Sequence, residues 1–296
     1  MESIKMITDS SCDLPKSLLE AYDITILPIP VTVDGIGYLE SIDFTSVEFY
    51  DILQKAAEIP KTAQITPFQY YEQFEIAYHK GYGHIITICL TSTGSNIFSS
   101  AVTAKELFFQ RNPEAQSRLS ISIVDSKTYS FNYGYAVLQA GIMAADGKSC
   151  DEILSFLEDW FNRIEVYFAP FSFEYAKKSG RIGHSAAFVG EVLGLRALVS
   201  IIDGETKIVA KPRGNAALYQ TMLELAEKRM EPKAPYGFIK GTEPEADVML
   251  HKLFVNRFGY EPFGVYDAGP AIAINSGPRM IGVGFLGSNR QTTNIK

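Results

Sequence analysis

The sequence predicts an α/β protein with two domains, at residues 1–162 and 163–296. Strand-like and helix-like segments alternate up to about residue 162, which is typical of a parallel sheet flanked by helices. Residues 84–90 form a continuous apolar run, as expected of a parallel strand that is buried on both faces. After residue 162 the alternation gives way to hairpin signals, which predict a mixed α/β domain with its own sheet.

The N-terminal domain is expected to begin with a strand at residues 4–8 that leads into small polar residues and then a helix. Asp13 is the candidate N-cap of that helix, because its carboxylate could accept a first-turn amide. Residues 24–33 are strongly β-prone, and Asp34-Gly35 predicts a tight hairpin turn after them. A further strand is expected at residues 119–124, before another helix.

Capping boxes predict where three helices of this domain begin. In a capping box, an N-cap hydroxyl and a Glu or Gln three residues later each accept a hydrogen bond from the other residue's backbone amide. Proline follows the N-cap in one of them, at a position where its missing N–H costs nothing. The pairs are Thr45 with Glu48, Thr66 with Gln69, and Ser149 with Glu152.

The C-terminal domain is expected to hold a hairpin turn at Asp203-Gly204 and a helix cap at Thr242-Glu243-Pro244-Glu245. Its tail, residues 263–285, is predicted to form two or three strands joined by Gly-Pro turns. No linker rich in Pro or Ser separates the domains, so we expect them to pack tightly. The other expected elements are strands at residues 166–173, 197–202, 207–210 and 236–239 and a helix at 216–229.

Four loops of small polar residues adjoin apolar strands and carry the candidate chemistry. Because ligands bind at the carboxyl ends of parallel strands, we expect such loops to surround one anionic group with neutral hydrogen-bond donors. Any single loop could instead cap a helix, and for the first we expect only a bracing role. The loops are Thr8-Asp9-Ser10-Ser11, Thr62-Ala63-Gln64, Thr91-Ser92-Thr93-Gly94-Ser95-Asn96 and Asn275-Ser276-Gly277-Pro278.

Composition argues against several classes of partner. The net charge of -7 disfavours nucleic acid and constitutive binding to an anionic membrane, because both depend on basic residues. Three widely spaced cysteines fit neither a zinc site nor a disulfide framework, so we expect reduced thiols in a cytoplasmic protein without metal or cofactor. The N-terminus lacks a signal-peptide pattern, and no apolar run is long enough for stable membrane insertion.

The order and spacing of these motifs resemble the DegV family over nearly the whole chain. The resemblance also includes Asp125-Ser126 and Lys178-Ser179-Gly180-Arg181-Ile182. It implies a two-domain α/β fold without catalytic activity of its own, which buries one long-chain fatty acid, such as palmitate, between its domains. It further implies a partner, a fatty acid kinase, to which the acyl carboxylate is presented.

Carried over by position, Thr62 and Ser95 would hold the carboxylate, while Arg181 and the strand-end loop at Asn275 would line its surroundings. Neutral hydroxyls suit this task because an unpaired buried carboxylate is very costly, and they leave its oxygens open to phosphorylation. The ligand-binding residues that we predict are Thr62, Ser95, Asn96, Arg181, Asn275 and Ser276.

The sequence departs from the family pattern where relatives usually have His-Thr-Gly-Pro-Gly, since it has Asn275-Ser276-Gly277-Pro278-Arg279. Asn275 can still donate a hydrogen bond, but a titratable donor beside the headgroup is lost. Ala63 and Asn96 replace a serine and a glycine of the family pattern. The departure at Asn275 bears on the kinase-substrate role more than on fatty acid binding.

Two other functions stay open. The helix start at Gly94-Ser95-Asn96 could hold the phosphate of a small phosphorylated metabolite, although no GxGxxG or Walker A pattern points to a nucleotide. Ser95 could instead be the nucleophile of a hydrolase. No histidine accompanies these loops, and Lys178 is the only nearby candidate base.

Overall fold

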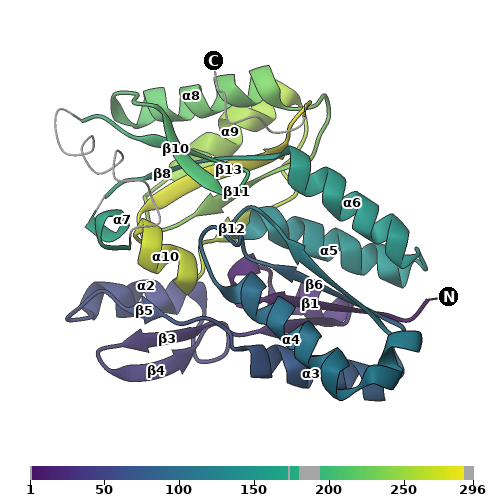
Figure 1. Ribbon diagram of the computed structural model, residues 1–296. Coiled ribbons are helices and arrows are strands. Elements are labelled where there is room, and N and C mark those ends of the chain that lie inside the picture. Colours follow the sequence, from purple (N-terminus) through teal and green to yellow (C-terminus); the bar gives the residue numbers. More distant parts are fainter. Residues whose placement is uncertain (1, 173, 180–193, 290–296) are drawn as a thin grey trace.

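The computed structural model describes residues 2–172, 174–179 and 194–289. Its N-terminal half is built on the predicted parallel sheet, in which four strands pair in the order β2-β1-β6-β7 (Figure 1). The carboxyl ends of these strands therefore meet at one edge of the sheet, which gathers the loops that follow them. The strands are β1 (Ile4–Asp9), β2 (Ile24–Leu27), β6 (His84–Cys89) and β7 (Ser120–Asp125).

Helices cover both faces of this sheet, as predicted. Figure 1 shows α3 (Pro67–His79) and α4 (Ile97–Arg111) on one face and α5 (Phe131–Ala145) on the other. Residues 85–89 of β6 are all buried, so a strand of this composition needs apolar cover on both sides. The remaining elements of this half are η1 (Ser10–Cys12), α1 (Lys16–Ala21), α2 (Ser46–Lys55), η2 (Pro113–Ser117) and α6 (Cys150–Arg163).

The predicted capping boxes are confirmed at the starts of α2, α3 and α6, each with both reciprocal hydrogen bonds. The predicted cap at Asp13 is wrong. Pro15 occupies the N-cap position of α1, and Asp13 instead ends η1 with a φ of 55°. Its carboxylate is used elsewhere, because it accepts a hydrogen bond from the backbone of Gly269 in the C-terminal half.

A separate three-stranded antiparallel sheet packs against α2 and carries Thr62 at one side. Its hairpin turn at Asp34-Gly35 has φ values of 48° and 83°, which confirms the predicted tight turn. The strands run in the order β4-β3-β5, with β3 (Pro30–Val33), β4 (Ile36–Leu39) and β5 (Lys61–Thr62).

The β-prone stretch predicted at residues 24–33 forms two strands that belong to different sheets. Strand β2 ends at Leu27 in the parallel sheet, and β3 begins at Pro30 in the small antiparallel sheet. Pro28 and Pro30 have no N–H to donate, so they interrupt the ladder that one long central strand would need. The chain uses this interruption to change sheets.

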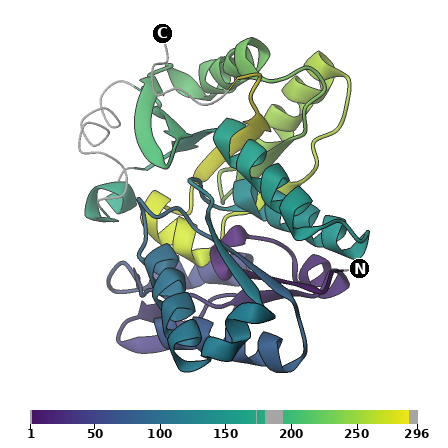
Figure 2. The same cartoon turned by 45° about the vertical axis from the view of Figure 1, so that its right-hand side comes forward.

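The C-terminal half contains the predicted mixed sheet. Six strands pair in the order β10-β9-β8-β13-β11-β12, and the described pairs are antiparallel except for β11 with β12. Figure 2 shows α8 (Gly214–Arg229) and α9 (Ala246–Phe258) on the face that points away from the N-terminal half. The strands are β8 (Ile164–Pro170), β9 (Leu198–Ile202), β10 (Glu205–Ala210), β11 (Tyr236–Lys240), β12 (Val265–Asp267) and β13 (Met280–Leu286).

Two predictions for this half are wrong. The tail is not made of strands alone, because α10 (Pro270–Ser276) lies between β12 and β13. Its start at Gly269-Pro270 follows the preference of proline for the first turn of a helix. The segment before α9 does not cap that helix through a side chain, since Glu245 occupies the N-cap position with a φ of 57°.

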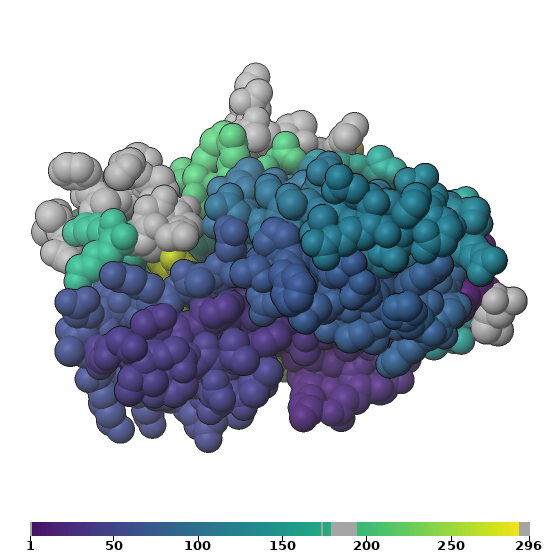
Figure 3. All heavy atoms as spheres, turned by 60° about the horizontal axis from the view of Figure 1, so that its bottom comes forward, coloured from purple at the N-terminus to yellow at the C-terminus, as the bar shows by residue number. Residues whose placement is uncertain are grey.

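Strand β8 connects two cores because its side chains alternate between the faces of the mixed sheet. Val166 and Phe168 belong to the core shared with the N-terminal half, whereas Tyr167 and Ala169 belong to the core beneath α8 and α9. In Figure 3 a small yellow patch of C-terminal residues is visible directly above the blue N-terminal residues at the left of the view. The domain boundary near residue 162 stays a prediction, with β8 beginning directly after α6.

Candidate functional site

A cavity of about 480 Å³ lies where the two halves meet. Its size falls within the usual range of small-molecule sites, roughly 300–1,000 Å³. The inner face of the mixed sheet forms an apolar wall, and the loops of the N-terminal half form a polar one. The apolar wall contains Val166, Phe168, Ile201, Ile239 and Met280, and the polar one contains Thr62, Ser92, Thr93, Ser95, Asn96, Tyr129, Ser130 and Asn132.

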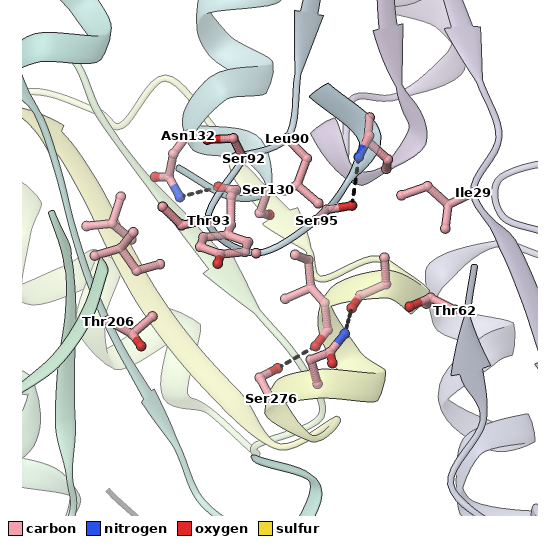
Figure 4. A pocket seen from close by; sticks show the side chains of 18 of the residues that line it. Ile29, Thr62, Leu90, Ser92, Thr93, Ser95, Ser130, Asn132, Thr206 and Ser276 are labelled. Atoms are coloured by element: carbon pink, nitrogen blue, oxygen red, sulfur yellow. Dashed lines mark hydrogen bonds between the residues drawn. The ribbon is translucent and has the colours of Figure 1, made fainter. Parts of the chain in front are cut away.

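Segments that are far apart in the sequence line the cavity. In Figure 4, Thr62 and Ile29 lie at the right of the view, Asn132 and Thr206 lie at the left, and Ser95 lies between them. Thr62 comes from β5 and Ser95 from the loop before α4, so separate segments supply the hydroxyls. A molecule in this space would meet hydroxyl groups from several segments and the apolar side chains of the mixed sheet.

Five of the predicted ligand-binding residues line this one cavity: Thr62, Ser95, Asn96, Asn275 and Ser276. The fold thus brings together three segments that are far apart in the sequence. Arg181, the sixth, lies outside the described residues. The assignment of all six as ligand contacts stays a prediction.

Ser95 and Asn96 lie at the N-terminus of α4. The Ser95 hydroxyl oxygen accepts a hydrogen bond from the Ile97 amide at 3.3 Å, which leaves its own proton for donation. Asn96 occupies the N-cap position without a side-chain cap bond. The amides of the first turn and the positive end of the helix dipole favour an anion beside Ser95.

Asn275 and Ser276 lie in the last turn of α10, not in the strand-end loop that we predicted. Asn275 Nδ2 donates to the Ala271 carbonyl at 2.7 Å, and Ser276 Oγ donates to the Ile272 carbonyl at 2.9 Å. Both side chains therefore bond to their own helix while they line the cavity. The Asn275 amide has a second N–H.

The Thr8-Asp9-Ser10-Ser11 loop lies behind the cavity wall and does not line it. The buried Asp9 carboxylate accepts the Leu90 amide at 2.8 Å and the Tyr133 hydroxyl at 2.6 Å. Burial raises the pKa of Asp9, and these hydrogen bonds to its ionised form oppose that rise. Asp9 thus holds the start of the 91–96 loop in place, which is the bracing role expected from the sequence.

The β9–β10 hairpin closes over the same loop. Thr93 Oγ1 donates to the Gly204 carbonyl at 2.6 Å, and Lys127 pairs with Asp203 at 3.2 Å. A β-carbon on Gly204 would lie 2.7 Å from the hydroxyl oxygens of Thr91 and Thr93. Because the tip rests directly on the loop, the hairpin holds its residues Ile201 and Thr206 against the cavity.

The described walls of the cavity contain no histidine, lysine or arginine. Lys178, the candidate base for a Ser95 nucleophile, is exposed and pairs with Glu174 at 3.4 Å. Among the described residues, no group of three His, Cys, Asp or Glu side chains could hold a metal ion. None of the helices in the described ranges is both long and apolar enough to cross a membrane.

Comparison with known proteins identifies the family. A family model described as an uncharacterised protein of the DegV family matches residues 3–288. The chain belongs to the DegV family. A DegV domain-containing protein from Caldanaerobacter subterraneus subsp. tengcongensis is 28% identical over 293 residues, covering 96% of this chain and 99% of the relative.

Two solved structures share the fold of this DegV chain. One is a stearic acid-binding protein from Eubacterium ventriosum, with a TM-score of 0.84 and 24% identity over 97% of this chain and 98% of the other. The second is from Thermus thermophilus, described as fatty acid binding of a DegV family protein. It has a TM-score of 0.82 and 24% identity over 96% of this chain and 99% of the other. The two-domain α/β architecture is therefore that of DegV proteins.

Three cavity residues of this DegV chain at the start of α5 were not predicted from the sequence: Tyr129, Ser130 and Asn132. Ser130 adopts φ 61° and ψ -153°, a region that is essentially restricted to glycine and costs about 1–3 kcal/mol. Its hydroxyl donates to Asp13, which helps to hold this conformation. The available signal was position alone, because Ser130 follows a parallel strand just as the 91–96 loop does.

Proposed function

We propose that this DegV protein binds a long-chain fatty acid in the cavity between its halves, with the carboxylate at Thr62 and Ser95 and the tail along the mixed sheet. The single observation that carries the proposal is one cavity with an apolar wall and hydroxyls at the N-terminus of a helix. The two solved DegV structures, whose descriptions name stearic acid or fatty acid binding, support it.

Most of the expected binding free energy comes from the acyl tail. Each buried methylene contributes about 0.8 kcal/mol, so about 15 methylenes contribute roughly 12 kcal/mol before the costs of association. The headgroup needs only to be satisfied, because a buried carboxylate without hydrogen bonds is very unfavourable. Hydroxyls and first-turn amides satisfy it without an ion pair, which keeps its oxygens accessible.

We also propose a carrier role, in which the protein presents the acyl carboxylate to a separate fatty acid kinase. The support is that neutral hydrogen-bond donors would hold the carboxylate without an ion pair and so leave its oxygens accessible to a kinase. Asn275 supplies an amide where the family pattern has histidine, so any phosphorylation would proceed without a titratable donor from this position. Kinase assays with wild type and Asn275→His test this role apart from binding.

The test of binding is organic extraction of the freshly purified protein, followed by mass spectrometry of the extract. We expect about one fatty acid per chain, and its identity would give the chain-length preference. A protein that carries no lipid and also fails to bind added palmitate would overturn the proposal.

A small phosphorylated metabolite is the second candidate ligand. The observation that favours it is the start of α4 beside Ser95, since helix N-termini bind phosphate well. Thermal unfolding separates the two candidates. Stabilisation by a phosphorylated sugar but not by palmitate would support this alternative.

Gly204→Ala is expected to weaken palmitate binding about tenfold, because the new β-carbon collides with Thr91 and Thr93 and lifts the hairpin from the loop. Gly35→Ala is a matched control. Gly35 has a φ of 83° in the same kind of Asp-Gly turn, and nothing lies within 4 Å of its β-carbon position. Both variants carry the same left-handed strain, so equal affinities in a titration would show that the hairpin does not close the site.

A further inference from the structure

Helix α10 is held at its N-terminus by two carboxylates from the N-terminal half. Asp13 Oδ1 accepts the Gly269 amide at 3.1 Å, and Glu40 Oε1 accepts the Ala271 amide at 2.8 Å. The N-cap residue Gly269 has no side chain that could do this itself. Because α10 places Asn275 and Ser276 in the cavity wall, both acids act on the site from behind it.

The other oxygen of each carboxylate bonds to a different part of the wall. Glu40 Oε2 accepts from the Ser10 hydroxyl, and the Ser10 oxygen in turn accepts the Ile29 amide at 2.9 Å. Asp13 Oδ2 accepts from the hydroxyl of Ser130. Ile29 and Ser130 both line the cavity, so the acids tie α10 to two further segments around the ligand space.

The two carboxylates lie close together. A β-carbon on Gly269 would be 2.3 Å from Asp13 Oδ1 and 3.0 Å from Glu40 Oε1, so both acids converge on this one residue. Both carboxylates can approach the backbone of Gly269 because glycine has no side chain. Two buried carboxylates that both approach Gly269 would repel each other strongly if both were ionised.

The surroundings supply no counter-charge from the described residues. No lysine, arginine or histidine in the described ranges forms an ion pair with Asp13 or Glu40, and Lys240, near Tyr50, pairs with Asp247 instead. Burial raises the pKa of Glu40 to about 7, and burial with the Glu40 charge raises the pKa of Asp13 well above its usual range. The titratable groups around the pair are Asp9, Cys12, Tyr50, Tyr133 and Asp267.

We propose that Glu40 and Asp13 are positioning residues of the acyl site, and that at least one of these two carboxyl groups is protonated when the ligand is bound and loses its proton as pH rises when the site is empty. The inference rests on the proposed fatty acid binding. An acyl carboxylate adds another negative charge to a region that already holds Asp9, Asp13 and Glu40, so binding favours the protonated form of the pair and affinity falls as pH rises. The Ser10 oxygen can accept a hydrogen bond from protonated Glu40, so the same contacts serve both states.

The test is titration of cis-parinaric acid, a fluorescent long-chain fatty acid, at pH 6 and pH 8. Wild type is expected to bind about tenfold more weakly at pH 8, up to the limit of tenfold per pH unit for one linked proton. Glu40→Gln keeps an acceptor for the Ala271 amide but cannot titrate, so we expect it to lose most of this pH dependence. Glu40→Ala removes the acceptor as well, and we expect it to bind about tenfold more weakly at both pH values.

Glu152→Gln is the matched control, because Glu152 accepts a helix N-terminal amide in the exposed capping box of α6. It should leave the affinity and its pH dependence unchanged. Should Glu40→Gln fail to fold, Asp13→Asn provides the same comparison. The inference would be overturned if the wild-type affinity did not depend on pH, or if Glu40→Gln and Asp13→Asn kept the wild-type pH dependence of affinity. Either result would leave the proposed function standing. A wild type that binds no fatty acid would overturn the proposed function itself.

Unfolding experiments without ligand give a second readout. A carboxyl group whose pKa is higher in the folded state loses stabilisation as pH rises from its unfolded pKa to its folded pKa. For Glu40 this window runs from 4.5 to about 7. Relative to Glu40→Gln, the wild type is therefore expected to lose stability across this range. A difference in the free energy of unfolding between wild type and Glu40→Gln that stays constant with pH would contradict a proton on buried Glu40.

Discussion

Palmitate is expected to bind this protein about 10⁴-fold more tightly than octanoate, because eight buried methylenes contribute roughly 6 kcal/mol. The wall formed by Val166, Phe168, Ile201, Ile239 and Met280 is the surface on which this difference depends. Competition of both acids against cis-parinaric acid measures it directly.

Hexadecanol is the control for the headgroup in this experiment, since it has the same tail and no charge. It should bind more weakly than palmitate and far more tightly than octanoate if the tail dominates. Equal affinities of palmitate and octanoate would mean that the acyl chain does not lie along the mixed sheet. In that case the small phosphorylated ligand would become the better proposal.

The combined variant Thr62→Val and Ser95→Ala is expected to weaken palmitate binding by about 10²- to 10⁴-fold. Each hydroxyl donates to the carboxylate in our proposal, and a hydrogen bond to a charged group contributes about 1.5–3 kcal/mol. Isothermal titration calorimetry gives the affinity, and thermal unfolding shows whether the variant remains folded. The change at residue 62 removes a hydroxyl without changing the shape of the side chain.

Thr66→Ala is the matched control for this pair. Thr66 also carries a hydroxyl near β5, but that hydroxyl caps α3, so its loss should cost about 1 kcal/mol of stability and little affinity. Wild-type affinity in the combined variant would contradict the assignment of Thr62 and Ser95 to the headgroup. Loss of affinity in Thr66→Ala would mean that palmitate binding depends on the position of α3 and not on the hydroxyls of Thr62 and Ser95.

Local signals predicted much of the fold. The capping boxes at Thr45, Thr66 and Ser149 and the turns at Asp34-Gly35 and Asp203-Gly204 are all present. These features could be predicted from the sequence because each depends on hydrogen bonds or φ values within about four residues. The buried run of β6 was readable for a similar reason, since its composition requires a strand covered on both faces.

The failures lie where a distant segment decides the local structure. Asp13 has the residue type of an N-cap, but its carboxylate is taken by Gly269 and Ser130, which come from other elements. The β-prone stretch at residues 24–33 divides between two sheets, and Asn275 lies in the last turn of a helix that the apolar tail did not reveal. Pattern analysis within a short window contains no information about such partners.

For the candidate site, the sequence by itself determined the chemistry. It supplied hydroxyl-rich loops beside apolar strands, and its order of motifs resembled the DegV family, which the match over residues 3–288 confirms. Only the tertiary structure decided that Thr62, Ser95 and Asn275 line one cavity, and that Glu40, Asp13 and Ser130 support it. The physical reason is that residue type and spacing set what a side chain can donate or accept, whereas its partner depends on the packing of the whole chain.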